Sequence, residues 1–164
     1  MKRNALKAGF GIVEVVVGSA VIAVVVFGFT SLSAQLLRTS YANSDRVKAV
    51  HLSEEGIEAI RFIRDSDWNT FSALTNGASY DVVLSGGVWQ ASASRSMIDG
   101  RFLRTVMLSS VYRDTAGAVV ASGGTLDADS RKVVVSIEWK NHASTTPAAA
   151  STTETISTYL NRIF

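Results

Sequence analysis

The feature that most limits how this chain can fold is an apolar run near its N-terminus. Between Ala8 and Leu37, a run of 30 residues, the only ionisable side chain is that of Glu14. As a helix this run would extend about 45 Å, which is long enough to cross a bilayer. The sequence therefore predicts one membrane-spanning helix, with the span placed from Phe10 to Leu32.

This N-terminus has two ordinary explanations. A cleaved secretory signal has an apolar stretch of about 7–15 residues, and the run here is about twice that length. A signal anchor fits better, because its basic residues would stay cytoplasmic while the following chain is exported. The basic residues are Lys2, Arg3 and Lys7. A plain anchor leaves Gly9, Phe10 and Glu14 unexplained.

Glu14 is the anomaly in the apolar run. A carboxylate at the centre of a bilayer costs a few kcal/mol, and a position near the start of the span softens that cost. No Lys or Arg lies within the predicted span. A cut between Gly9 and Phe10 would create a cationic α-amine at Phe10 and make Glu14 the fifth residue of the mature chain.

Residues Lys7 to Glu14, with the sequence KAGFGIVE, resemble the cleavage and methylation signal of type IV pilins and type II secretion pseudopilins. The shared features are a short basic leader, Gly before the cut, Phe after it, Glu at mature position five and an apolar helix. The resemblance implies that a prepilin peptidase cuts after Gly9 and N-methylates Phe10. It also implies that Glu14 pairs with the N-terminal amine of a neighbouring subunit during assembly.

The match departs from the family in two places. Gly11-Ile12-Val13 stands where the family commonly has Thr-Leu-Ile, and the only proline is Pro147, so the family's helix-kinking proline is missing. Any break in the helix is therefore expected at Gly18, Gly28 or the Thr30–Ser33 stretch.

The helix is expected to continue beyond the membrane and to end near Asp65–Asp67. Large apolar residues recur at helical spacing on one side, which predicts an amphipathic stripe against a globular head. These residues are Val47, Val50, Ile57, Ile60 and Ile63, with Glu54 on the same side. The opposite side carries Arg46, Lys48, Glu55, Glu58, Arg61 and Arg64. Glu58–Arg61 and Arg61–Asp65 are spaced as helical charge pairs.

The remaining chain reads as short strands separated by turns. The expected strands cover 80–84 and 88–91 (a hairpin), 102–112, a short 119–120, 132–139 and 153–163. The expected loops are 65–79, 123–130 and 141–151. One long helix followed by an antiparallel sheet of about four strands is an α+β fold. The expected divisions are a leader (1–9), a membrane and assembly half of the helix (10–37), an amphipathic half (38–66) and a β-sheet head (67–164).

Other candidate sites are weaker. Asp127 and Asp129 could ligate calcium, but the spacing lacks the full loop signature, so a polar loop is the simpler reading. His51 near Glu54 and Glu55 is expected on a solvated helix face.

Arg95, Arg101 and Arg104 with Phe102 could bind DNA, although a solvated strand face is the favoured reading. Trp68, Trp89 and Trp139 are expected to pack rather than to bind a ligand. No hydrolase or phosphate-loop motif occurs, and no cofactor is implied.

Charge and cysteine content exclude further classes. The formal charge is +2, but removal of the three basic leader residues leaves 13 basic and 14 acidic residues, so the charge does not indicate nucleic-acid binding. The chain has no cysteine, which excludes disulfides and thiol catalysis.

The sequence thus predicts a structural subunit of a type IV pilus or pseudopilus and not an enzyme. Implied partners are the prepilin peptidase, other pilin subunits, the inner-membrane assembly machinery and the lipid bilayer. Before assembly it would cross the inner membrane once with a cytoplasmic N-terminus. It would then form an extracellular or periplasmic filament. The alternative is a low-copy minor pilin that acts as an adhesin or DNA-binding module.

Overall fold

A single long helix, α1, dominates the first half of the chain in the computed structural model, which describes residues 11–140 and 151–163. It runs from Ile12 to Ser66, a length of 55 residues. The predicted helix and its end near Asp65–Asp67 are confirmed. The backbone stays helical through Gly18, Gly28 and the Thr30–Ser33 stretch, the places to which any kink or melting was assigned. The chain consists of two compact units, and the boundary between them lies between Tyr41 and Ala42.

Hydroxyl side chains within the apolar part of α1 are satisfied by the helix itself. Ser19 and Thr30 each donate a hydrogen bond of 2.9 Å to the carbonyl oxygen three residues earlier. Such bonds hide a polar group on a helix surface without a partner from elsewhere. The helix therefore passes these residues uninterrupted.

Asp67 ends α1 and starts a second, short helix, α2, from Trp68 to Ser72. The Asp67 carboxylate accepts hydrogen bonds from the backbone N–H groups of Asn69 and Thr70, which otherwise lack helical partners. The Thr70 hydroxyl and these N–H groups hold the pKa of Asp67 below its usual value. The predicted loop over residues 65–79 was therefore wrong in part, because the cap builds one turn of helix inside it.

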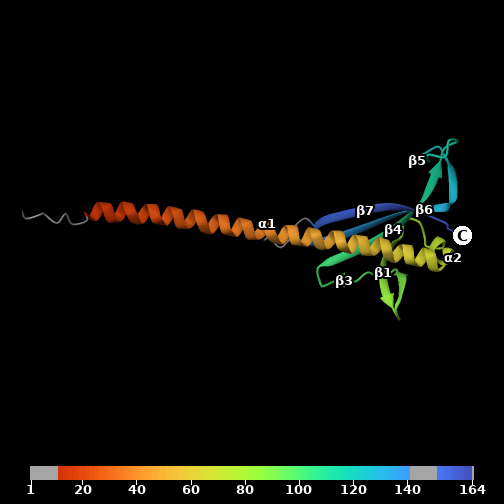
Figure 1. The fold of residues 1–164 in the computed structure, drawn as a ribbon, viewed down its shortest axis with the longest axis horizontal. Helices are drawn as coiled ribbons and strands as arrows, with labels where there is room; N and C mark the ends of the chain where they lie inside the picture. Colours follow the sequence, from red (N-terminus) through yellow and green to blue (C-terminus); the bar gives the residue numbers. More distant parts are fainter. Residues whose placement is uncertain (1–10, 141–150, 164) are drawn as a thin grey trace, which may run out of the picture. The chain divides into compact units, whose positions relative to one another are not determined.

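The strands of the described residues after α2 form an antiparallel sheet (Figure 1). Within the described residues it has seven strands, with the order β2-β1-β4-β6-β7 and with β3 and β5 each paired to β4. The strands are β1 (Ser79–Ser85), β2 (Val88–Ser92), β3 (Met97–Ile98), β4 (Phe102–Arg113), β5 (Val119–Val120), β6 (Thr125–Lys140) and β7 (Ser151–Asn161). The α+β class is confirmed.

The predicted count of about four strands was too low. β3 was not predicted, because its two residues are too few to produce an alternating pattern. β5 forms at Val119–Val120, where a short strand was expected. The β1–β2 hairpin forms as expected, since Gly86 and Gly87 both take the positive φ angles that its tight turn needs.

A bulge between Ser110 and Val111 changes the second half of β4. Before it, Phe102, Arg104, Val106 and Leu108 are buried on one face, as the alternation predicted. After it, Val111 is buried where the alternation placed it on the opposite face. Beyond the bulge, β4 continues to pair with β6 as far as Arg113 and Thr125. Residues 125–130 are therefore strand, and the predicted loop there was wrong.

From residue 42 onward, α1 packs over one face of the sheet, and their side chains form one core. The buried residues of α1 are Asp45, Ala49, Leu52, Ser53, Gly56, Ile57, Ala59, Ile60 and Ile63. Ile57, Ile60 and Ile63 were predicted correctly, but Val47 is 57% exposed. The prediction followed large apolar residues only, whereas four of the nine buried residues are small: Ala49, Ser53, Gly56 and Ala59.

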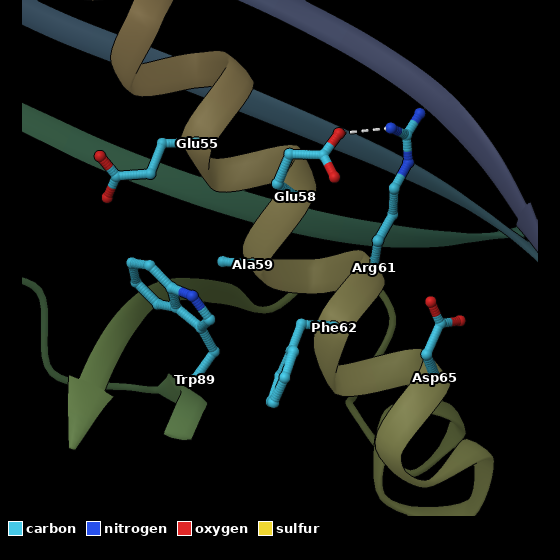
Figure 2. A pocket seen from close by; sticks show the side chains of 7 residues that line it. All are labelled: Glu55, Glu58, Ala59, Arg61, Phe62, Asp65 and Trp89. Carbon is cyan, nitrogen blue, oxygen red and sulfur yellow. Dashed lines mark hydrogen bonds and ion pairs between the residues drawn. The ribbon is translucent and has the colours of Figure 1, made fainter. Parts of the chain in front are cut away.

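The charged side of α1 forms pairs along the helix. The predicted Glu58–Arg61 pair is present at 2.5 Å (Figure 2). Asp65 pairs with Arg64, whose Nε lies 2.7 Å from its carboxylate, and not with Arg61 as predicted.

Gly56 is the point of closest approach between α1 and the sheet. A Cβ atom at this position would lie 2.9 Å from Val135 Cγ1 and 3.2 Å from Arg104 Cδ. Neither neighbour is free to move, because Val135 is fully buried and Arg104 is held in buried ion pairs. The glycine is thus required by packing.

Gly56→Ala is expected to destabilise the protein by about 1–3 kcal/mol, as overpacked cores do. In an exposed helix the same change would stabilise the protein by about 1 kcal/mol. A loss of stability would therefore show that the added methyl group meets the sheet. The measurement is denaturant unfolding of the full chain in detergent micelles. Val135→Ala should relieve the clash. The double variant should therefore lose less stability than the sum of the losses of the two single variants. Ser44→Ala on the exposed side of α1 is the control, and a stabilised Gly56→Ala variant would contradict the packing.

Candidate functional site

The apolar part of α1 is the first candidate site. Every residue from Gly11 to Tyr41 is exposed in this structure. This helix is long and apolar enough, near the N-terminus, to cross a membrane. Apolar surface of this extent is normally covered by lipid or by another protein.

A shallow hollow of about 360 Å³ on this part of the helix is lined only by Val17, Ala20, Val21, Val24 and Val25. It offers an apolar partner a surface for close packing and no polar group to bind.

Glu14 lies in the first turn of α1. A negative charge there is favoured by the helix dipole. The next basic residue along α1 is Arg38, 24 positions later, which corresponds to about 36 Å of helix. No cation of the described helix is therefore within reach of Glu14. The predicted processing residues Gly9 and Phe10 lie outside the described residues. Phe10 is also the first residue of the predicted span.

A buried arginine network ties α1 to the sheet. The Arg104 side chain is 5% exposed and its Nε donates to Asp81 at 3.0 Å. Its other two nitrogens donate to Glu55 on α1 at 3.0 Å and to the carbonyl oxygen of Val82 at 2.5 Å. The planar guanidinium thereby satisfies three acceptors from two elements.

This network overturns the expectation for the basic strand. Arg104 and Phe102 are buried and so do not lie on a solvated face. Arg101 makes a two-pronged pair with Asp45 on α1, at 2.7 and 3.0 Å, and Arg95 donates to Thr105. Arg101 and Arg104 link α1 to the sheet, and the residues considered as a DNA site do not form an open basic surface.

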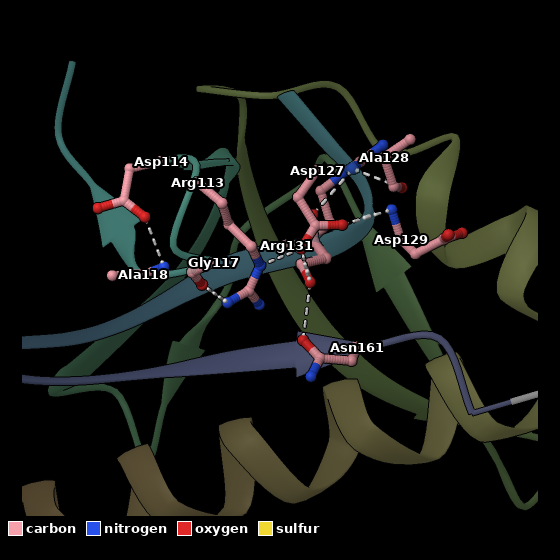
Figure 3. A network of polar contacts seen from close by, with 10 residues as sticks. Arg113, Asp114, Gly117, Ala118, Asp127, Ala128, Asp129, Arg131 and Asn161 are labelled. Carbon is pink, nitrogen blue, oxygen red and sulfur yellow. Dashed lines mark hydrogen bonds and ion pairs between the residues drawn. The ribbon is translucent and has the colours of Figure 1, made fainter. Parts of the chain in front are cut away.

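The two aspartates of the calcium hypothesis, Asp127 and Asp129, lie on β6 (Figure 3). Each of them pairs with an arginine. Asp127 accepts from Arg113 Nε at 2.7 Å and from the Ser130 hydroxyl at 2.6 Å. The Ser130 hydroxyl, followed by Arg113, holds the pKa of Asp127 below its usual value. These contacts therefore stabilise the pairing of β4 with the start of β6 at pH values above the usual pKa of Asp127. The stabilisation is lost as the pH falls through the lowered pKa of the folded protein.

Asp129 lies 3.7 Å from Arg162. Among the residues that the structure describes, no group of three or more metal-ligating side chains comes together. His51 pairs with Glu54 at 3.5 Å on an exposed helix face, as expected.

The tryptophans divide into two kinds. Trp139 is buried, and Trp68 packs against the core next to Phe71. Trp89 also packs against the core but keeps part of its ring exposed beside α1. Sequence reasoning missed the pairs of Asp45 and Asp81, because their partners Arg101 and Arg104 lie far away along the chain.

No protein-family model matches the chain, and no curated protein or solved structure matches it significantly.

Arg104→Met is expected to cost about 3–5 kcal/mol, because it leaves the Asp81 carboxylate buried without its cation. Adding Asp81→Leu should recover much of this loss, because the double variant removes both buried charges. The measurement is the free energy of unfolding of the full chain in micelles. Arg95→Met removes an exposed arginine and should stay within about 0.5 kcal/mol of the parent. An Arg104→Met variant as stable as this control would contradict a buried pair.

Proposed function

We propose that this chain is a structural subunit of a type IV pilus or a related pseudopilus. It is made as a precursor, cut after Gly9 by a prepilin peptidase, N-methylated at Phe10 and polymerised through α1. The observation that carries the proposal is the sequence KAGFGIVE at the start of a long apolar helix.

The structure supports this proposal in two ways. The exposed apolar surface between Gly11 and Tyr41 needs a partner, which the bilayer supplies before assembly and neighbouring helices supply afterwards. The residues from Ala42 onward bury a core of their own, so they can remain folded in both settings.

Glu14 and the new N-terminus act together in this proposal. A single carboxylate in an apolar medium is unfavourable, whereas a carboxylate beside an amine is compensated. Because the described helix has no base near Glu14, the α-amine of Phe10 in a neighbouring subunit is the partner that assembly would supply. The carboxylate then favours the filament over the isolated subunit.

Mass spectrometry of the protein from the membrane fraction of its native host tests the processing step. We expect a mature chain that begins with N-methylated Phe10 and lacks residues 1–9. Gly9→Val should remain unprocessed, because the family signal requires glycine before the cut. A parent protein that keeps Met1 would contradict the proposal.

Glu14→Ala is expected to leave cleavage intact and to lower incorporation into sheared filaments by roughly tenfold or more, since about 1.4 kcal/mol lost per contact is a tenfold change. Val16→Ala, a small change on the same exposed part of the helix, is the matched control. The readout is the ratio of filament to membrane protein on an immunoblot. Normal incorporation of the Glu14→Ala variant would refute the role given to this carboxylate.

A further inference from the structure

An open groove lies between α1 and the β1–β2 hairpin. Its volume is about 410 Å³, and we call it the Trp89 groove, after the side chain that forms one wall. Glu55, Ala59, Phe62 and Asp65 line it from α1 (Figure 2). A second hollow of about 420 Å³ lies along the hairpin and shares Trp89.

Two aromatic rings make this groove apolar at its centre. Phe62 is 43% exposed, although it lies next to the charged residue Arg61. Trp89 is partly exposed, and Figure 2 shows both rings on the same side of the helix near Ala59. The exposed ring faces carry partial negative charge and attract cations.

Three acids line the groove, and each is paired with an arginine. The pairs are Glu55–Arg104, Glu58–Arg61 and Asp65–Arg64. The bases at the two ends lie deeper than their acids: Arg104 is 5% and Arg64 14% exposed, whereas Glu55 and Asp65 are 47% and 51% exposed. Arg104 also pairs with the buried Asp81, so that one base serves two acids. The ends of the groove therefore present carboxylates to solvent, with their arginines behind them.

We propose that the Trp89 groove binds an extended, basic segment of a partner protein through its arginine or lysine side chains. The rings would pack against the apolar stem of such a side chain and the carboxylates would meet its charge. An anionic partner would be repelled, and a neutral apolar one would leave the carboxylates unused. This inference concerns the head alone and does not depend on the filament proposal.

The distance between the acids at the two ends of the groove determines how long the bound segment must be. Glu55 and Asp65 are ten residues apart on α1, or about 15 Å along its axis. Two basic residues four positions apart in an extended peptide are separated by about 13 Å. A segment with the pattern basic, three small or apolar residues, basic would therefore reach both ends of the groove.

The test titrates the full chain in dodecyl maltoside micelles with the capped peptide Arg-Ala-Leu-Ala-Arg. This detergent is uncharged, whereas a phosphocholine detergent would itself offer a cation to the aromatic rings. The readout is the ¹⁵N-labelled indole resonances of the three tryptophans. We expect a saturable shift of Trp89 that weakens with added salt, and little change at the buried Trp139. The same peptide with citrulline in place of arginine keeps the shape, loses the charge and should not shift Trp89.

Variants then locate the binding site, and the affinity of each is measured by fluorescence anisotropy of the labelled peptide. Glu55→Gln, which can still accept the Arg104 hydrogen bond, should weaken binding about three- to tenfold, and Trp89→Leu should weaken it similarly. Glu54→Gln, an exposed acid outside the groove, should bind as the parent does. An unchanged Trp139 resonance in each variant shows that the core is intact.

Three results would overturn the proposal. The first is equal binding of the arginine and citrulline peptides. The second is unchanged affinity in both groove variants. The third is a shift of Trp89 with protein concentration in the absence of peptide, which would make a second copy of this chain the occupant.

Discussion

The hydrophobic effect on one half of a helix governs this molecule. From Gly11 to Tyr41 no residue is buried, and Glu14 is the only charged residue between Gly11 and Leu37. Surface of this kind is unfavourable in water and is normally covered by lipid or by another protein. After Tyr41 the same helix α1 buries residues in its own head. One helix therefore has an exposed apolar part and a part that packs on the sheet, and the head builds its core without residues of the apolar part.

The head meets this requirement by close packing and by paired charges. Gly56 brings α1 against Val135, and Arg104 joins Glu55 on the helix to Asp81 on the sheet. Arg101 and Asp45 make a second link of the same kind. Buried pairs are weak sources of stability compared with apolar contacts, but each fixes one arrangement because a broken pair is costly. The helix is thus held to the sheet in a defined register.

Much of this fold follows from local sequence pattern. The helix bounds, the β1–β2 hairpin and the long strands β4, β6 and β7 have strong periodic or turn signals. The buried face of α1 followed only in part: Ile57, Ile60 and Ile63 were predicted, whereas Ala49, Ser53 and Gly56 carry little hydrophobic signal. The β6 start at Thr125 was hidden by polar residues whose partners, Arg113 and Asn161, come from other strands. Arg104 was misplaced for the same reason, since its acceptors lie on two distant elements. Glu14 was singled out as a candidate because a lone acid in an apolar run can be recognised without knowledge of tertiary structure.

The central claim is that α1 passes from an apolar medium into a water-exposed head. The chain has no cysteine, so single cysteines report their surroundings without background. Val25 and Val119 are both exposed in this structure, so only what surrounds the molecule can distinguish them. In intact membranes that expose the head, a membrane-impermeant maleimide should label Val119→Cys and should label Val25→Cys only after denaturation in dodecyl sulfate. Equal labelling of the two variants in intact membranes would contradict the account.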